Sequence, residues 1–246
     1  MEAIIFAAGL GTRLQPLTND RPKALVTVEG HTLLEINIEN LIRQGADHIV
    51  INVHHHSDMM RRFIADYHCP IPLTISDESD LLLDTGGGLR KMSRNHLLYT
   101  DGPYLLYNVD VLSHIDLHAM LAQHNASGNM ATLATSIRNT DRQLLFDSDN
   151  LLCGWHNRRT DEYRWSRTIT TTPTELAYSG IAVISSAFLS LISKEESDVF
   201  SITTALLNYA SDNRIGCFPH PSADWLDVGK PETLAKAAEF LHHFNS

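Results

Sequence analysis

The sequence predicts an α/β protein with a mainly parallel, twisted sheet and helices on both of its faces. Four apolar runs of strand length alternate with helical stretches as far as residue 109, an order typical of parallel sheets with crossover helices. The first apolar run leads directly into a glycine-rich loop, as it does in Rossmann-like nucleotide-binding folds. At 246 residues the chain is long enough for one large domain with a buried core. We therefore predict a single Rossmann-like domain spanning residues 1–246.

The first half of the chain provides the parallel part of the predicted sheet. Thr32 and Glu35 have the spacing of a capping box, and Gly45 is placed to end the helix that this box begins. The apolar runs between helices have the length and composition of buried strands. The predicted strands are residues 3–7, 48–53, 73–76 and 104–109, and the predicted helices are residues 32–45, 57–67 and 86–94.

The second half of the chain has a less regular pattern. Asp116 can cap a helix that runs to residue 123, and Pro231 is well placed to open a final amphipathic helix. Residues 154–175 are polar and rich in arginine and threonine, and we expect an extended arm or loop over the site. The remaining expected elements are strands at 130–136 and 178–185 and a hairpin with a polar turn at 146–151.

Composition and charge argue against several classes of function. A net charge of −10 disfavours nucleic-acid binding, because neutralising a phosphate backbone requires a basic face. No apolar run approaches the roughly 20 residues needed to cross a bilayer, and no signal segment precedes the first strand. Cys69, Cys153 and Cys217 lie far apart, which fits a reducing compartment better than a disulfide framework. We expect a cytoplasmic protein without membrane or nucleic-acid partners, and leave open whether it is a monomer or a homo-oligomer.

The glycine loop after the first strand predicts a site for a nucleoside polyphosphate. Gly9 and Gly11 allow a sharp turn that brings backbone N–H groups close to a ligand. Arg13 and Lys23 place a guanidinium and an ammonium beside this loop, and cations with amides can neutralise phosphates. We expect Arg13 and Lys23 to be catalytic. The predicted nucleotide-binding residues of this segment are Gly9, Leu10, Gly11, Thr12, Arg13 and Lys23.

Two other glycine-loop motifs fit this segment less well. A P-loop needs four residues between its glycines and then Gly-Lys-Ser/Thr, a pattern that is absent here. A dinucleotide fingerprint needs a third glycine where Leu14 stands and an acid at the end of the second strand. That strand ends with Asn52 and is followed by His54, so the pattern disfavours a dehydrogenase.

Two aspartates follow or end apolar segments and are candidates for a metal site. Asp110 comes directly after the strand at 104–109, and Asp227 lies in the segment Trp225-Leu226-Asp227-Val228-Gly229. Open α/β sheets bind ligands at the carboxyl ends of their strands. Magnesium takes one or two carboxylates, with phosphates and waters completing its octahedron. Either aspartate alone could be an ordinary turn residue, but together with the polyphosphate loop they favour a Mg²⁺ site.

The composite motif resembles the signature loop of the sugar-phosphate nucleotidyltransferases. Beyond the glycine loop and Arg13, it includes Pro16, Thr18 and the group Pro22-Lys23-x-Leu25. Other segments that resemble this family are Asp84-Thr85-Gly86-Gly87-Gly88, Tyr178-Ser179-Gly180-Ile181 and the segment around Asp227. The resemblance therefore spans nearly the whole chain. It implies the nucleotide-diphospho-sugar transferase type of α/β fold.

The resemblance also implies a reaction and roles for individual residues. A sugar phosphate oxygen would attack the α-phosphorus of a nucleoside triphosphate and release pyrophosphate. Arg13 would contact the β- and γ-phosphates, Lys23 would contact the α-phosphate, and Asp110 and Asp227 would hold the catalytic Mg²⁺. Residues 1–112 would form the nucleotide-binding half, and residues 113–246 the half that binds the sugar and completes the metal site. Val109 departs from the family, which usually has glycine there, so we expect ordinary β backbone and a narrower sugar pocket.

The remaining site residues come from the same resemblance. Three glycines open the helix at residue 86, where backbone could approach a base closely, although such a segment is also consistent with a plain flexible helix start. The family reads the base here, which implies nucleotide contacts for Asp84, Gly86 and Gly87. It implies sugar contacts for Asn108, Ser179 and Gly180.

Three functions are compatible with these motifs. The pattern is most similar to the family members that join UTP to N-acetylmuramate 1-phosphate, and a related hexose 1-phosphate is an equivalent substrate. Guanylyl transfer to a mannose or heptose 1-phosphate is the second possibility. A catalytically silent protein that binds nucleotide sugars is the third, and it is motivated by Val109.

Overall fold

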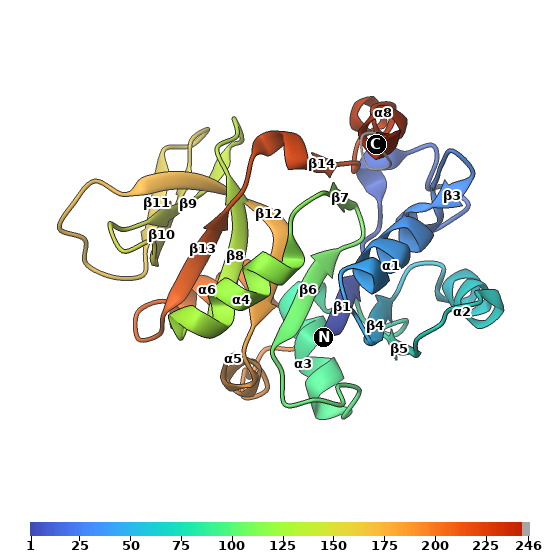
Figure 1. The fold of residues 1–246 in the computed structure, drawn as a ribbon, viewed down its shortest axis with the longest axis horizontal. Helices are drawn as coiled ribbons and strands as arrows, with labels where there is room; N and C mark the ends of the chain where they lie inside the picture. Colours follow the sequence, from blue (N-terminus) through green and yellow to red (C-terminus); the bar gives the residue numbers. More distant parts are fainter. Residues whose placement is uncertain (243–246) are drawn as a thin grey trace.

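The computed structural model describes residues 1–242, and most of its strands belong to one ten-stranded sheet (Figure 1). Four neighbouring strands in the order β6-β1-β4-β5 run parallel to one another. They are β1 (Glu2–Phe6), β4 (His48–Val53), β5 (Leu73–Asp77) and β6 (Tyr104–Asn108). These are the four strands predicted from apolar runs in the first half of the chain, so the α/β class is confirmed.

The long strand β12 (Thr174–Ile184) joins this parallel part to the rest of the sheet. It runs antiparallel to β6, to β8 (Ala131–Ser136) and to β9 (Arg142–Phe146). Its register against β8 shifts between Tyr178 and Ala182, where Gly180 has a φ of +72°. Strand β13 (Ile215–Pro219) is parallel to β8. The sheet is therefore mixed. Its parallel strands β6, β1, β4 and β5 form one end of the strand order, and the glycine loop follows β1 there.

Helices cover both faces of the sheet because its strands present apolar side chains on both sides. In β1, Ile4 and Phe6 enter one core cluster while Ala3 and Ile5 enter the other, as the two-residue period of a strand requires. On the first face lie α3 (Asp84–Arg94), α5 (Ser186–Ile192) and α6 (Ile202–Tyr209), and on the second lie α1 (Leu33–Arg43), α2 (Ser57–Asp66) and α4 (Leu117–Ser127).

Two helix starts have the caps that were predicted. At α1 the Thr32 hydroxyl accepts from the Glu35 amide at 3.1 Å, while the Glu35 carboxylate accepts from the Thr32 amide at 2.6 Å. At α4 the Asp116 carboxylate accepts from the Ala119 amide at 2.9 Å. Each cap satisfies backbone donors that a helix N-terminus otherwise leaves without partners.

The segment 154–175 is more regular than the arm or loop that its composition predicted. It contributes the end of β10 (Leu152–Asn157), all of β11 (Glu162–Trp165) and the start of β12. Strand β10 pairs with β9 on one side and β11 on the other, all antiparallel. Antiparallel pairing in the consecutive hairpins of β9 with β10 and of β10 with β11 thus orders a polar segment that has no strong strand pattern of its own.

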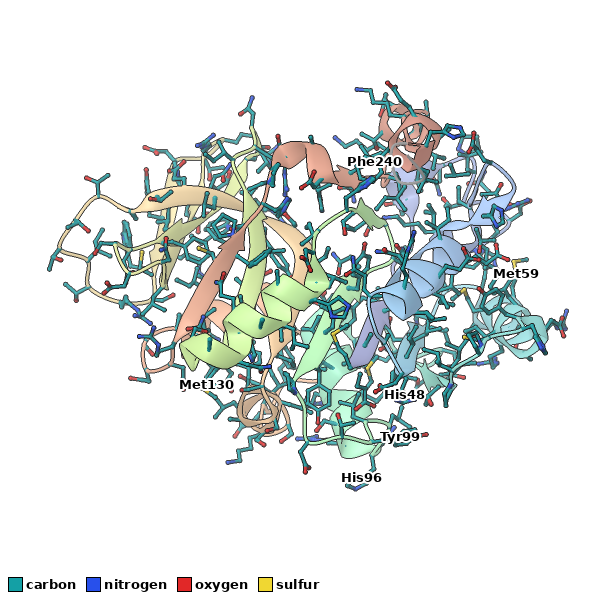
Figure 2. All side chains as sticks on the ribbon, viewed as in Figure 1. His48, Met59, His96, Tyr99, Met130 and Phe240 are labelled. Atoms are coloured by element: carbon teal, nitrogen blue, oxygen red, sulfur yellow. The ribbon has the colours of Figure 1, made fainter. Side chains whose placement is uncertain are left out.

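The C-terminal part of the described chain crosses back to the N-terminal half (Figure 1). The predicted final helix is two short ones, α7 (Pro231–Leu234) and α8 (Ala237–His242). In α8, Phe240 packs edge-on against His114, with ring centroids 4.4 Å apart. On the other side of the view in Figure 2, His48 stacks on Tyr99.

Among residues 1–242, no helix combines the length and apolar character needed to cross a membrane.

Two small two-stranded sheets lie beside the main one. Strands β2 (Thr27–Val28) and β3 (His31–Thr32) form a hairpin before α1. Strands β7 (Val111–Ser113) and β14 (Trp225–Asp227) are antiparallel, although more than 100 residues separate them. The second pair matters for the site because it brings Trp225–Asp227 to the carboxyl end of β6.

Candidate active site

The glycine loop leaves β1 at the carboxyl end of the parallel strands and is held by side chains from other segments. The Asn52 side-chain oxygen accepts from the amides of Ala7 and Ala8 at 2.6 and 3.2 Å. The Thr18 hydroxyl donates to the Gly11 carbonyl at 2.8 Å. Gly11 has a φ of +67°, and a Cβ there would lie 3.0 Å from the Thr18 side chain. Glycine is therefore required at position 11 for both conformation and space.

The next part of the loop offers unused hydrogen-bond donors. Within residues 1–242, the backbone N–H groups of residues 9–13 donate to no protein acceptor. They lie where the two short 3-10 turns Thr12–Leu14 and Lys23–Leu25 bring Arg13 and Lys23 to the same side. Clustered amides with a nearby guanidinium and ammonium form an anion site.

The two predicted metal aspartates are brought together by the pairing of β7 with β14. Asp227 pairs with Val111, the residue after Asp110, and the Val228 amide donates to the Asp110 carbonyl at 2.9 Å. The Asp110 carboxylate forms an ion pair with Lys23, whose side chain is only 10% exposed. Arg13 lies 3.7 Å from Asp110 and 3.9 Å from Asp227 through its two Nη atoms. The four residues predicted to carry the chemistry thus form one cluster.

These two aspartates are the residues that could hold a divalent cation. Carboxylate oxygens are the hard ligands that Mg²⁺ prefers, and a site of two carboxylates leaves positions for phosphate oxygens and water. No group of three or more metal-binding side chains is found in the described part of the chain. The donor set therefore fits an ion bound jointly by protein and substrate.

Gly229 lies in the site although it was not among the predicted site residues. Its amide donates to the Asp227 carboxylate at 2.7 Å. A Cβ at this position would lie 2.6 Å from Asp227 Oδ1, 2.8 Å from Arg13 Nη2 and 3.2 Å from Asp110 Oδ2. Only glycine leaves room for the carboxylates and the guanidinium to meet here.

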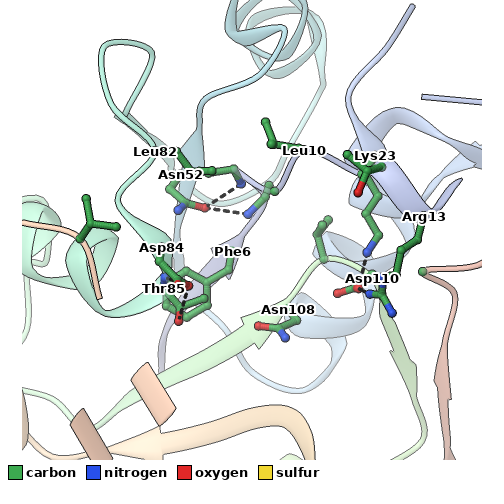
Figure 3. A pocket seen from close by; sticks show the side chains of 18 residues that line it. Phe6, Leu10, Arg13, Lys23, Asn52, Leu82, Asp84, Thr85, Asn108 and Asp110 are labelled. Atoms are coloured by element: carbon green, nitrogen blue, oxygen red, sulfur yellow. Dashed lines mark hydrogen bonds and ion pairs between the residues drawn. The ribbon is translucent and has the colours of Figure 1, made fainter. Parts of the chain in front are cut away.

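Two cavities meet at this cluster. The first has a volume of about 520 Å³ and is lined by the glycine loop, Asp84, Thr85 and Val199 (Figure 3). Figure 3 shows Lys23 and Arg13 pointing toward Asp110 at one end of this cavity, with Asp84 at the other. The second has a volume of about 1040 Å³ and extends over the sheet toward β10 and β11. The residues that line both cavities are Arg13, Asp84, Thr85, Asn108 and Asp110.

The three predicted sugar contacts line the second cavity in different ways. The Asn108 side chain packs on Gly180, where a Cβ would lie 2.7 Å from Asn108 Nδ2. Ser179 is fully buried, and its hydroxyl is hydrogen-bonded to His220 and Arg138. The structure therefore places all three residues at the cavity wall, with the Ser179 hydroxyl engaged in hydrogen bonds inside the protein.

Gly86 and Gly87 are not brought to either cavity. Their amides donate to the Phe200 carbonyl at 2.9 and 3.1 Å. A Cβ on Gly87 would lie 2.1 Å from the Asp198 carbonyl oxygen. These glycines let the segment at 198–200 pack directly on α3, whereas Asp84, the first residue of that helix, does line both cavities. Base contact was expected of all three residues, and the geometry leaves only Asp84 in position for it.

A sequence profile of the nucleotidyl transferase family matches residues 2–145, more than half of the chain. The chain belongs to the nucleotidyl transferase family. Its similarity to an N-acetylmuramate α-1-phosphate uridylyltransferase of Caulobacter vibrioides is 39% identity over 111 residues, which is 44% of this chain and 45% of that protein. A mannose-1-phosphate guanyltransferase of Gibberella zeae is 33% identical over 138 residues, 55% of this chain and 37% of that one. The matched segments thus cover less than half of these relatives.

Two solved structures have the same fold as this chain. HddC from Yersinia pseudotuberculosis, in complex with GMP-PN, superposes with a TM-score of 0.73 at 20% identity, covering 98% of this chain and 99% of HddC. The inositol-1-phosphate CTP transferase from T. maritima superposes with a TM-score of 0.74 at 17% identity, covering 100% and 96%. At these identities the likeness concerns the fold alone.

Val109 occupies an ordinary buried position in this chain. It is not among the residues with positive φ, which agrees with the conformation expected for a β-branched residue. Its amide donates to the Phe6 carbonyl at 3.1 Å, and its carbonyl accepts from the Asn37 side chain at 2.8 Å. The backbone that leads into Asp110 is therefore anchored on both sides, and valine replaces glycine there without strain.

A buried carboxyl group lies behind the glycine loop. Glu78 is fully buried, and its Oε1 accepts from the side-chain amide of Asn52 at 2.9 Å. Its Oε2 has no hydrogen-bond partner among the described residues. Burial raises the pKa of Glu78 above its ordinary value of 4.5, and the hydrogen bond from Asn52 opposes this only in part. Glu78 holds Asn52, and Asn52 holds the amides of Ala7 and Ala8.

Replacing Glu78 by glutamine is expected to change how stability depends on pH. With a raised pKa in the folded state, Glu78 lowers stability as the pH rises above 4.5, because the unfolded chain loses this proton first. Glutamine keeps the acceptor for Asn52 and has no such dependence. We expect the melting temperature of Glu78→Gln relative to wild type to rise between pH 4.5 and pH 8. A difference that stays constant across this range, measured by calorimetry, would contradict the raised pKa.

Proposed function

We propose that this chain transfers a nucleotidyl group from a nucleoside triphosphate to a sugar 1-phosphate, forming a nucleotide sugar and pyrophosphate. The observation that carries the proposal is the cluster of Arg13, Lys23, Asp110 and Asp227 at the junction of two cavities. One cavity is walled by the loop whose amides are free for phosphates, and the other is large enough for a sugar. Family membership supports the same reaction class.

The chemistry needs neutralisation and alignment of charge and no covalent intermediate. An oxygen of the sugar 1-phosphate forms a bond to the α-phosphorus, the bond between that phosphorus and the bridging oxygen to the β-phosphate breaks, and pyrophosphate leaves with the bond's electron pair. Arg13 and the amides of residues 9–13 would bind the β- and γ-phosphates. Lys23 would stabilise negative charge at the α-phosphate, where it increases as the new bond forms.

We further propose that Mg²⁺ is the cofactor and that Asp110 and Asp227 hold it. When bound, the ion would neutralise phosphate charge and align the reacting groups. The two carboxylates are only partly exposed, at 17% and 36%, and form ion pairs with the cations Lys23 and Arg13. A site with this balance of charge is suited to binding a metal together with an anionic substrate.

For substrates, we propose UTP with N-acetylmuramate 1-phosphate or a related hexose 1-phosphate. The support is the 39% identity to the Caulobacter uridylyltransferase. Guanylyl transfer to mannose 1-phosphate or a heptose 1-phosphate is the second candidate, because several relatives at 33–35% identity are mannose-1-phosphate guanylyltransferases. A silent nucleotide-sugar-binding protein is the third and lacks a specific observation in its favour, since Val109 leaves the carboxylate cluster intact.

A screen of pyrophosphate release tests the reaction and separates the candidates. Each of the four nucleoside triphosphates is combined with glucose, mannose, heptose and N-acetylmuramate 1-phosphates, with Mg²⁺ and with a chelator. We expect rapid release with one nucleotide and one sugar, and none with the chelator. Release that persists in the chelator would contradict the role of Mg²⁺. Absence of release for every pair, with nucleotide binding intact, would favour the silent binding protein.

A further inference from the structure

We propose that Arg138 binds an oxyanion of the sugar 1-phosphate substrate. This proposal rests on the function proposed above and deepens it. Arg138 follows β8 and lines the larger cavity. None of the sequence motifs includes it, and its partners lie on β8, β12 and β14.

The guanidinium of Arg138 is fixed in place by neutral groups. Its Nη1 donates to the Ser136 and Ser179 hydroxyls at 2.6 and 2.8 Å, and its Nη2 donates to the Tyr178 carbonyl at 2.8 Å. Its central carbon lies 3.6 Å from the centre of the Trp225 ring, which is a cation–π contact. These bonds use three of its five N–H groups. In the described residues, the Nε proton and one Nη2 proton have no protein acceptor.

The hydrogen bonds around Ser179 have a defined direction. His220 Nδ1 donates to the Pro221 carbonyl at 2.8 Å, so a neutral His220 can only accept at Nε2. The Ser179 hydroxyl donates to that nitrogen at 2.7 Å and therefore accepts from Arg138. Burial, assisted by the charge of Arg138, lowers the pKa of His220 and keeps it neutral. Trp225 is held as well, because its indole N–H donates to the Ser179 carbonyl at 2.7 Å.

Among residues 1–242, no acidic side chain forms a hydrogen bond or ion pair with Arg138. Its three hydrogen-bond acceptors are all uncharged, although Asp227 is near enough to influence it. Burial lowers the pKa of Arg138 to about 10, so it remains protonated at neutral pH. A partly buried cation held rigidly by neutral groups, with donors to spare, is completed by an anion from a ligand.

The position of Arg138 relates this anion to the substrate. Trp225 and Asp227 are two residues apart on β14, so their side chains share a face of that strand. Arg138 stacks on Trp225, so it lies next to the residue whose side chain shares a face of β14 with the proposed metal ligand Asp227. The rest of the cavity wall, leaving aside Arg13, Asp110 and Asp227, has more positive than negative side chains: Arg138, Arg142, Arg164 and Lys230 against Asp84 and Glu162. The oxyanion is either the 1-phosphate itself or a carboxylate on the sugar.

Calorimetric binding with two probes distinguishes these two sources. Glucose 1-phosphate has only the phosphate, whereas N-acetylmuramate 1-phosphate has a phosphate and a carboxylate. Both are titrated, with Mg²⁺, into wild type, Arg138→Met, Arg138→Lys and the control Arg62→Met, an exposed arginine on α2. We expect Arg138→Met to weaken binding about 10- to 100-fold and Arg138→Lys to recover part of it. Nucleotide affinity and melting temperature should equal those of the control.

The pattern across the probes identifies the oxyanion. Equal weakening of both probes assigns Arg138 to the 1-phosphate, and weakening of N-acetylmuramate 1-phosphate alone assigns it to the sugar carboxylate. Unchanged affinity for both probes would overturn the proposal while leaving the proposed function intact. Parallel loss of nucleotide binding and stability in both Arg138 variants would show a purely structural role and would also overturn it. A wild-type protein that binds neither probe and releases no pyrophosphate would contradict the function itself.

Discussion

Replacing Asp110 by asparagine is expected to reduce pyrophosphate release about a thousand-fold or more. Asparagine has almost the same shape but lacks the negative charge that makes a carboxylate a strong Mg²⁺ ligand. Asp110 also forms ion pairs with Lys23 and Arg13, so replacing its carboxylate disturbs the cations that the phosphates need. The measurement is the steady-state rate with saturating substrates over a range of Mg²⁺ concentrations. We expect the remaining activity to need a higher Mg²⁺ concentration.

Two further variants make this result interpretable. Asp116→Asn is the matched control, because Asp116 is an exposed helix cap at which asparagine serves equally well. Its rate and stability should equal those of wild type. Asp227→Asn removes the second carboxylate without leaving a buried lysine unpaired, since Asp227 contacts the more exposed Arg13. Wild-type rates in both Asp110→Asn and Asp227→Asn would exclude these residues as metal ligands.

Much of the fold could be predicted because its signals are local. The apolar runs of β1, β4, β5 and β6, the capping box at Thr32 and the cap at Asp116 are all readable within a few residues of sequence. The start of β12 and the hairpin of β10 and β11 were harder to predict, because these polar residues become ordered only when they pair within the sheet. A polar segment such as 162–165 has no periodic pattern that would indicate its place at the edge of a sheet.

The residues of the candidate site also differ in how far the sequence could predict them. Arg13, Lys23 and Asp110 belong to motifs whose residue types already specify phosphate and metal chemistry, and the structure brings them together with Asp227. Gly86 and Gly87 resembled a ligand-binding segment, but the need for space comes from the chain at 198–200, which Arg90 ties to α3 through Asp198 and the Glu195 carbonyl. Arg138 could not be predicted because its partners lie 2, 40, 41 and 87 residues away. Such a role depends on tertiary packing, and no spacing in the sequence indicates it.

Gly229→Ala is expected to lower kcat about a hundred-fold while leaving the fold intact. The added methyl group would lie 2.6 Å from Asp227 Oδ1 and 2.8 Å from Arg13 Nη2, so at least one of these groups must move. Displacements of about 1 Å in a site that works by alignment cost rates of this order. Gly229 does not have a positive φ, so alanine fits its backbone and stability should change little. The measurements are kcat, both KM values and the melting temperature.

The control for Gly229→Ala is Glu232→Ala, an exposed position on α7 three residues further along the same segment. It should match wild type in every measurement. The collision at position 229 involves both carboxylates and Arg13, so we expect the Mg²⁺ concentration for half-maximal rate to rise together with the loss of kcat. Loss of nucleotide affinity alone would instead mean that the methyl group acts through Arg13 and leaves the metal site undisturbed. Unchanged kcat and unchanged Mg²⁺ dependence would show that the approach of these three side chains is not required for catalysis.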